Sequence, residues 1–458
     1  MAGPTLRAPI PAEEPRLRIG IILPEDRRQS VAVDLQDPGW QVADAGPPRE
    51  ASGPLVFARE GATVALCLGG TEVGRAEQWT LAAPEFEGIS RATVCGVPAG
   101  RGFHWRKLLD VALTDILTVR VHDGQLVLVN EVPLERYLAG VITSEMSGDC
   151  PASFLEAQAV VARSWTLSAD RRKHAELAID FCNDDCCQRF QGLADVSQTA
   201  RGAVARTRGV VLRHGGGIVE ASYSKSCGGI VESPEYVWGR TRPGQSALID
   251  APADGPTAAF FGKLDSRFEE FAAGAWLEGA DAFCGPLRIQ PSEASRFLGR
   301  VDDGDSHFRW SVDYAREELE CILRAKLFAK AIEDGEDLAE LDTLLDLVPL
   351  ERGLSGRITA LAVDYRSLGR TRHRRLILDQ HAIREVLSET FLLSSAFFPR
   401  IERDDDGIPI RIVLIGAGWG HGAGFCQQGG VGMALAGYAS PAILAHYFPG
   451  VAQERIYR

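Results

Sequence analysis

The sequence predicts an α+β protein, in which mixed sheets and a buried pair of helices follow a β-rich N-terminal unit. Three observations support this class. Short apolar runs punctuated by Gly and Pro fill residues 1–105. Two consecutive segments then have the apolar spacing of helices, and strands and helices alternate irregularly to the end. We therefore expect a first unit over 1–105 and a second region over 106–458, whose two lobes, about 106–260 and 261–458, flank a cleft.

Composition excludes several classes of protein. Apolar residues make up 45% and charged residues 24% of the 458 residues, which is typical of a globular protein and unlike a disordered one. No apolar run is long enough for a transmembrane helix. The net charge of -13 argues against nucleic acid as a partner.

The N-terminus lacks the basic start and apolar stretch of a signal peptide, which favours an intracellular location unless the given chain omits the signal.

The individual elements follow in order along the chain. LTVRVHDGQLVLVN is a hairpin around Asp-Gly, and VPLERYLAGVITSEM has helical spacing. After the break SGDC, Pro151 suits the first turn of a second, strongly apolar helix, PASFLEAQAVVARSWTLSADRR. GVVLRHGGGIVEASY is a second hairpin, EELECILRAKLFAKAIE an amphipathic helix, SGRITALAVDYRS a strand, and RRLILDQHAIREVL a strand and helix. The strand RIVLIGAG, a Gly-rich loop and two short helices end the chain.

Glu145 lies where the first predicted helix ends, between two mostly apolar helices. A carboxylate in that position is expected to be partly desolvated. Desolvation favours the neutral form of a carboxylic acid, which is the form that a general acid needs. The residues therefore make Glu145 the first candidate for a general acid/base, and a solvated residue at a helix end is the alternative.

Gln158 and Arg163 lie on the second predicted helix. An arginine in an apolar stretch either extends to water or has a partner. Glu145 or a ligand hydroxyl would serve as that partner, and a surface salt bridge is the alternative. We expect both residues to bind substrate.

Three cysteines crowd into the segment CNDDCCQRFQG, and a histidine precedes them. Cys182, Cys186 or Cys187, together with His174, would supply three ligands to zinc, with Cys227 or a water as the fourth. Free or disulfide-bonded thiols are the alternative.

Two further segments combine polar side chains with glycine turns. ASYSKSCGG ends a predicted strand with Tyr223, Lys225 and Ser226, and strand ends that open into turns are where side chains reach a cleft. GWGHGAGFCQQGG places His421 between glycines, with Gln427 nearby, and glycine lets the backbone approach a ligand closely. We expect these residues to bind substrate. The alternative for His421 is a turn histidine that bonds only to the backbone.

Several of these segments together resemble one family. The resemblance runs from about Arg120 to Arg458 and is to the stage II sporulation protein D (SpoIID) and amidase-enhancer LytB family. The matching segments, in family order, are YLAGVITSEM…PASFLEAQAVVARSW, CQRFQG, GVVLRHGGGIVEASYSKSCGG, VWG, RGLSGRI and GAGWGHGAGFCQQGGVGMALAGY…ILAHYFPG. Residues before about 105 fall outside it.

The resemblance implies a lytic transglycosylase that cuts peptidoglycan glycan strands between N-acetylmuramic acid and N-acetylglucosamine and leaves 1,6-anhydro ends. The family's acid falls on Glu145, which would act alone, and the chemistry would require no cofactor. Sugar-binding roles fall on Arg163, Tyr223, Lys225 and His421. A location in the cell envelope, outside the cytoplasm, also follows from the resemblance.

Some members of this family bind zinc through Cys and His near the CQ motif. The resemblance therefore implies a structural zinc held by Cys182, Cys187 and His174. Cys186 is an additional thiol, and SKSCGG and GFCQ have cysteine where many relatives have serine. These departures leave open which thiols bind the metal.

Two other functions compete with catalysis. The LytB branch is described as enhancing a partner amidase, so a non-catalytic module that binds glycan strands and assists a cell-wall amidase is the main alternative. A protein that kept the fold for an intracellular task is the third.

Overall fold

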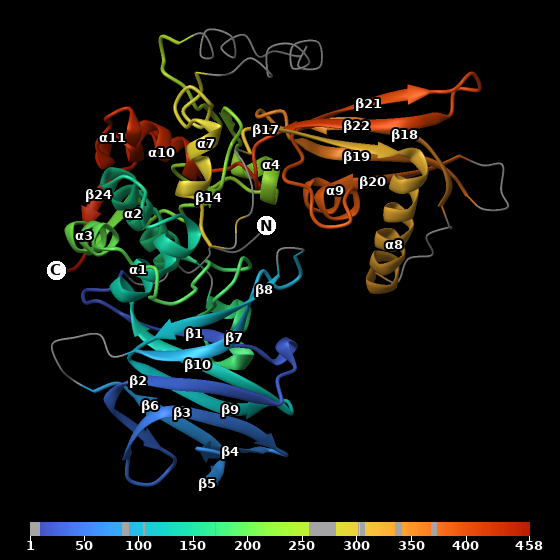
Figure 1. The fold of residues 1–458 in the computed structure, drawn as a ribbon. Coiled ribbons are helices and arrows are strands. Elements are labelled where there is room, and N and C mark those ends of the chain that lie inside the picture. Colours follow the sequence, from blue (N-terminus) through green and yellow to red (C-terminus); the bar gives the residue numbers. More distant parts are fainter. Residues whose placement is uncertain are drawn as a thin grey trace. The chain divides into compact units, whose positions relative to one another are not determined.

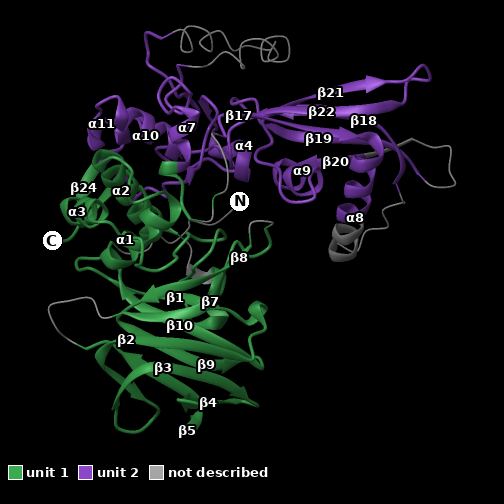
Figure 2. Ribbon diagram, in the orientation of Figure 1, with its two compact units in different colours: residues 1–212, 296–303, 453–458 green, residues 213–295, 304–452 purple. Residues whose placement is uncertain are grey.

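The computed structural model describes residues 10–84, 91–103, 106–169, 171–255, 281–300, 302, 307–334, 341–367 and 373–458. The chain divides into two compact units (Figure 2). Unit 1 comprises Met1–Leu212, Arg296–Asp303 and Gln453–Arg458, and unit 2 comprises Arg213–Ser295 and Gly304–Ala452. The predicted boundary near residue 105 falls inside unit 1, because the strands before and after it belong to one sheet.

Unit 1 contains an 11-stranded sheet that joins the β-rich N-terminal residues to the middle of the chain (Figure 1). The order of its main path is β11-β1-β10-β9-β6-β2-β3-β4-β5, and β7 pairs with β2 and β8. The strands are β1 (Arg16–Ile22), β2 (Ser30–Ala43), β3 (Arg49–Glu60), β4 (Thr63–Leu68), β5 (Thr71–Ala76), β6 (Gln78–Ala82), β7 (Ala92–Ala99), β8 (Lys107–Leu113), β9 (Ile116–His122), β10 (Gln125–Pro133) and β11 (Phe181–Cys182). The predicted Asp-Gly hairpin is confirmed as β9 and β10.

The helices of unit 1 are α1 (Leu134–Glu145), α2 (Ala152–Ser168) and α3 (Gln198–Arg206), with the short turns η1 (Pro24–Asp26) and η2 (Arg171–Leu177). The predicted helix pair is confirmed. Every residue of α1 except Arg136 is buried, and α1 packs against β1, β10 and α2. Helix α2 is buried over most of its length because its apolar residues surround the axis. Among the described residues, no helix has both the length and the apolar character to cross a membrane.

Unit 2 is built from several small sheets and helices. Its sheets have the orders β14-β23, β15-β16, β17-β22-β21 and β18-β19-β20, and the predicted second hairpin is β12 and β13. The strands from here to the C-terminal end are β12 (Val210–His214), β13 (Gly217–Ile218), β14 (Tyr223–Ser224), β15 (Ile230–Val231), β16 (Leu248–Ile249), β17 (Arg309–Ala315), β18 (Leu341–Arg352), β19 (Ile358–Ser367), β20 (His373–Asp379), β21 (Phe397–Arg403), β22 (Pro409–Ala417), β23 (Phe425–Cys426) and β24 (Ala452–Arg455). Of these, β12 begins in unit 1, and most of β24 belongs to unit 1.

The helices of this part of the chain are α4 (Pro234–Trp238), α7 (Pro291–Ala294), the turn η3 (Ser295–Phe297), α8 (Arg316–Asp334), α9 (Gln380–Val386), α10 (Gln427–Leu435) and α11 (Ser440–Tyr447). Apolar side chains of α8, α9 and the sheets around β19 and β22 form one core in unit 2. Helices and strands mix throughout both units, which confirms the α+β class.

Candidate functional site

Glu145 is the last residue of α1, and its side chain is buried. The helix ends there because Met146 is extended, with φ -134° and ψ 164°. Only 8% of Glu145 is exposed, and its Oε1 accepts a hydrogen bond of 3.1 Å from the backbone N–H of Arg189. The expected desolvation of this carboxylate is confirmed, and the alternative of a solvated helix end is wrong.

The segment that follows the cysteines is fixed against the end of α1. The backbone N–H of Gln191 donates to Ser144 Oγ at 2.9 Å, and the rings of Phe190 and Tyr137 lie 5.0 Å apart. Gly140 makes this approach feasible, because a Cβ atom there would lie 2.5 Å from Phe190. The loop therefore has one defined position beside Glu145.

Arg189 gives this loop a buried positive charge. Its guanidinium group pairs with Asp185 and Asp302, both in unit 1. Burial alone would lower the pKa of Arg189, but the carboxylates of Asp302, Asp185 and Glu145 hold it well above its ordinary value. Glu145 thus lies in the field of a permanently charged arginine.

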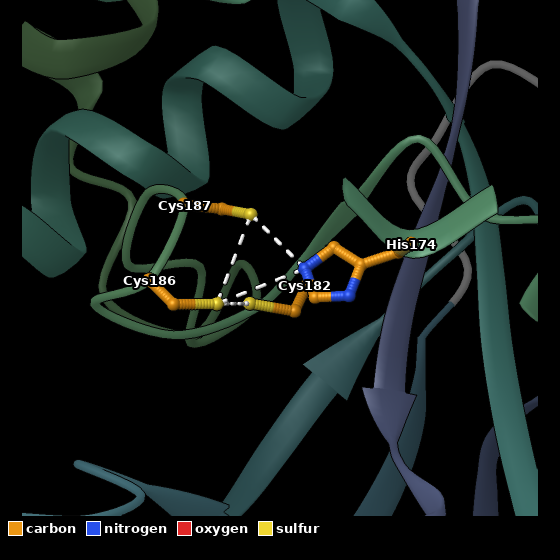
Figure 3. A group of neighbouring side chains, drawn as sticks. All are labelled: His174, Cys182, Cys186 and Cys187. Atoms are coloured by element: carbon orange, nitrogen blue, oxygen red, sulfur yellow. Dashed lines mark hydrogen bonds between the residues drawn. The ribbon is translucent and has the colours of Figure 1, made fainter. Parts of the chain in front are cut away.

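The four predicted zinc ligands of unit 1 lie together (Figure 3). Cys182 is on β11, His174 is on η2, and Cys186 and Cys187 are on the connecting loop. His174 Nε2 lies 3.7 Å from Cys186 Sγ and 3.4 Å from Cys187 Sγ, and all four ligand atoms are within 4.8 Å of one another. We call these residues the His174 group. Three sulfurs and one imidazole nitrogen at this spacing are a suitable donor set for tetrahedral zinc.

Cys186 is the thiol of this group that ionises most readily. Hydrogen bonds from Cys182 and Cys187 lower its pKa, and the pKa of Cys182 is raised in return. Cys186 lies with the other three residues, so it is a candidate for the fourth position that the sequence left open to Cys227 or water, and Cys227 belongs to unit 2.

Arg163 is placed differently from the prediction. Its side chain is fully buried, and its guanidinium pairs with Glu135 at 2.6 Å rather than with Glu145 or a ligand. Glu135 also accepts hydrogen bonds from Tyr457 Oη at 2.6 Å and from the backbone N–H of Gly209 at 3.1 Å. Arg163 is thus part of an internal network, because α2 is buried on the side that carries it.

Three other residues predicted to bind substrate are also internal. Gln158 and Ser226 have no exposed surface, and Gln427 is 1% exposed. Among the described residues, the amide of Gln158 and the hydroxyl of Ser226 have no hydrogen-bond partner. The structure thus places these three side chains in the interior, and their predicted contact with substrate stays a prediction. A polar residue near a glycine turn looks the same in sequence whether it faces a cleft or the core.

Tyr223, Lys225 and His421 are brought together within unit 2. β14 pairs in parallel with β23, and the bridge between Ser226 and Trp419 extends this contact. Lys225 is 7% exposed, and its Nζ lies 5.7 Å from the centroid of the Trp419 ring. Tyr223 and His421 are both half-buried. Two partly accessible rings and an aromatic platform therefore gather around the β14–β23 pair.

The imidazole of His421 is electrically neutral in this setting. Its burial and the guanidinium groups of Arg357 and Arg242 lower its pKa to about 3. His421 Nδ1 accepts a hydrogen bond of 3.1 Å from the backbone N–H of Ala423, and its ring lies 4.8 Å from that of Trp238. The backbone bond expected of a turn histidine is present, beside an aromatic partner.

Comparison with known proteins bears on the unit that holds Glu145. Residues 122–214 match the family model described as stage II sporulation protein, SpoIID. These residues include α1, α2, Glu145 and the whole His174 group. Residues 122–214 are therefore similar to the SpoIID family. Residues 288–424 match a second family model, described as a domain of unknown function (DUF8618).

Relatives extend the similarity beyond residues 122–214. The chain is 25% identical over 330 residues to an uncharacterized protein of Brachyspira hyodysenteriae, covering 72% of this chain and 69% of that protein. It is 25% identical to the amidase enhancer of Bacillus subtilis, over 68% of this chain and 39% of the enhancer. It is 27% identical to stage II sporulation protein D of Bacillus amyloliquefaciens, over 33% of this chain and 49% of that protein. The matches thus span less than half of either relative with a functional name.

Two sets of contacts in unit 1 escaped prediction. Glu135 and Tyr457 complete the network of Arg163, although they are far apart in sequence. Arg189 was visible in CQRFQG, but its contact with Glu145 depends on tertiary structure. In the sequence, the CQRFQG segment is linked to Glu145 only because both occur in the series of segments that resemble one family.

Proposed function

We propose that this protein is a peptidoglycan lytic transglycosylase in which Glu145 is the single acid/base. The observation that carries the proposal is the buried carboxylate of Glu145, placed at the end of α1 within the residues similar to the SpoIID family and held by the N–H of Arg189. A fixed, poorly hydrated carboxyl group beside a rigid loop is suited to proton transfer to and from a bound sugar.

The proposed reaction needs one carboxyl group. Protonated Glu145 donates its proton to the glycosidic oxygen as the bond from the muramoyl anomeric carbon breaks. The resulting carboxylate takes the proton of the muramoyl 6-hydroxyl, whose oxygen bonds to the anomeric carbon and closes the 1,6-anhydro ring. No water enters, so the second carboxyl group that most glycosidases need has no task here.

The His174 group would hold a structural zinc ion. Zinc bound by the three thiolates and the imidazole would fix the loop of residues 182–189 against α1, and it would supply no chemistry to the sugar. The chain's own residue Arg189 would then hold the Glu145 carboxylate in one orientation. This role is consistent with a loop that bonds both to the cysteines and to α1.

The other residues predicted to bind the sugar differ in how accessible their side chains are. Tyr223 and His421 are partly accessible, so we assign them contacts with sugar hydroxyls or the lactyl carboxylate. Lys225 would act through Trp419, on which its ammonium group lies. A peptidoglycan substrate implies that the protein works in the cell envelope.

A second function has one observation in its favour. The similarity to the amidase enhancer covers 68% of this chain, against 33% for stage II sporulation protein D. The chain would then bind glycan strands without cutting them and assist a cell-wall amidase.

One experiment separates the two functions. Purified protein is incubated with glycan strands that lack stem peptides, and anhydro-muramoyl ends are measured by mass spectrometry. The wild type should produce them, and Glu145→Gln should lower the rate at least about a hundredfold. Glu156→Gln is the matched control, because Glu156 lies on the neighbouring α2 and loses only an ion pair with the exposed Arg206. Binding of strands by the wild type without any anhydro product would reject the enzyme and favour the enhancer.

A further inference from the structure

A second group of potential metal ligands lies within unit 2, and no function assigned above uses it. Cys227, Asp250, Cys284 and Cys426 come from separate segments, yet their ligand atoms all lie within 4.8 Å of one another. All four residues are at most 2% exposed. We call them the Cys227 group.

The distances suit a tetrahedral ion. Cys227 Sγ and Cys284 Sγ are 3.7 Å apart. Two sulfurs on a tetrahedral zinc ion, each bound at about 2.3 Å, are about 3.8 Å apart, which is nearly the same separation. Cys227 Sγ also lies 3.1 Å from Asp250 Oδ2, so the carboxylate faces the sulfurs. The four atoms thus surround a position for one small ion.

Backbone N–H groups point at two of the sulfurs. Gly229 donates to Cys227 Sγ at 3.4 Å, and Cys426 Sγ accepts from Cys227 at 3.2 Å and from Gly429 at 3.3 Å. Cys426 is the N-cap of α10, where the helix dipole favours a negative group. An N–H donor favours a thiolate over a thiol at the sulfur that it meets, and the thiolate is the form of cysteine that binds a metal.

Asp250 is oriented for the same purpose. Its Oδ1 accepts from Tyr447 Oη at 2.7 Å and lies 3.1 Å from His446 Nε2, so Oδ2 is directed to Cys227. The Asp250 side chain has no exposed surface, so these bonds fix it in one orientation. Glycine at position 429 leaves room for this carboxylate, because a Cβ atom there would lie 2.4 Å from Asp250 Oδ2. A carboxylate anchored through one oxygen is a typical metal ligand.

Buried positive charges lie beside the Cys227 group. Three thiolates and one carboxylate carry four negative charges. A bound divalent ion would neutralise two of them, so two negative charges would remain. Two buried arginines, Arg309 and Arg357, face these ligands, since both interact electrostatically with Cys227 and Cys284, and Arg357 also interacts with Glu232. Arg309 donates to Gly228 O at 2.8 Å and Arg357 to Cys227 O at 3.3 Å, so both lie against the turn that carries Cys227.

We infer that Cys227, Cys284, Cys426 and Asp250 bind a structural zinc ion in unit 2, independently of the His174 group. Thiolate-rich sets select zinc over magnesium or calcium. Binding releases the thiol protons, including the one that Cys227 shares with Asp250. The ion would join the segment around Cys227 to those around Cys284 and Cys426, which are otherwise linked only by noncovalent contacts.

The test measures zinc per chain in the full-length protein, purified under reducing conditions without chelators, by plasma mass spectrometry. Cys284→Ser should lose about one zinc ion per chain relative to the wild type. Cys321→Ser, an exposed thiol of the same unit, is the matched control and should lose none. Cys182→Ser removes the His174 group, so its effect should add to that of Cys284→Ser. An unchanged zinc content in Cys284→Ser would overturn the inference.

A second measurement uses only the wild type, in case a variant fails to fold. N-ethylmaleimide labelling of the native protein is mapped by mass spectrometry with and without a strong chelator. Labelling of Cys227, Cys284 and Cys426 should increase at least about tenfold after zinc removal. Equal labelling in both conditions, or a disulfide between any two of the three in reduced preparations, would overturn the site. Neither measurement depends on glycan cleavage, so the proposed function is tested separately.

Discussion

The backbone N–H of Arg189 donates a hydrogen bond of 3.1 Å to Glu145 Oε1, and Arg189 follows Cys187 by two residues. The end of α1 and the His174 group are therefore joined through one short segment. Arg189 is held further by Asp185 and Asp302, so the segment has little freedom once the cysteines are fixed. A change that makes the His174 group more mobile should therefore also make the Glu145 carboxylate more mobile.

Zinc removal from the His174 group should loosen the segment that holds Glu145. In Cys187→Ser, hydrogen exchange of the amides of residues 183–192 should accelerate, and the rate of anhydro-product formation should fall by about tenfold or more. Exchange is measured by mass spectrometry and product formation by the glycan assay. Cys67→Ser, a thiol of the N-terminal strands, should change neither. Loss of activity with unchanged exchange would contradict a positioning role.

Arg163 and Glu135 should contribute to stability and not to substrate affinity. Arg163→Met leaves the Glu135 carboxylate buried without its cation, which should cost about 3–5 kcal/mol of unfolding free energy in urea denaturation. Arg206→Met removes a cation that is 56% exposed and should cost under about 1 kcal/mol. A stable Arg163→Met protein with a raised KM for glycan would restore the ligand role first predicted from the sequence.

His421 should make the fold less stable in acid. Its pKa in the folded protein is about 3, whereas an unfolded histidine titrates near about 6.5. Below about pH 6.5 the unfolded chain therefore binds a proton that the folded chain does not, so unfolding becomes more favourable as the pH falls toward about 3. His421→Gln should have a shallower loss of stability over that window. By NMR the His421 ring should stay neutral down to about pH 5, and titration near 6.5 would contradict the prediction.

Much of the fold was predictable because local signals agree with the tertiary structure. The Asp123-Gly124 turn, with φ values of 47° and 70°, needs residues that tolerate the left-handed region, so this residue pair alone indicates a hairpin. The apolar spacing of α1 likewise predicted a helix that ends near Glu145. The unit boundary was not predictable, because the pairing of β1 with β10 joins residues more than a hundred positions apart.

The candidate site was predictable only in part, for a related reason. The spacing of Cys182, Cys186 and Cys187 indicated the His174 group, since these ligands are close in sequence. The Cys227 group combines cysteines from three distant segments with an aspartate, and no local spacing predicts it. The partner of Arg163 was not predictable, because a buried arginine and a ligand-binding arginine have the same sequence context until the partner, Glu135, is located.

Gly140 should be required for the approach of the loop to α1. A Cβ there would lie 2.5 Å from Phe190 and 2.7 Å from Gly192 O, so Gly140→Ala must displace the loop that bonds to Glu145. We expect a loss of about 1–3 kcal/mol in unfolding free energy, together with weaker glycan cleavage. Gly202→Ala on α3 is the matched helical control. Its Cβ would meet only the end of the flexible Arg206 side chain, so the higher helix propensity of alanine should raise stability by about 0.5–1 kcal/mol. Equal stability of the two variants would show that the loop moves away from α1 at little energetic cost. The position of the loop would then not explain the burial of Glu145.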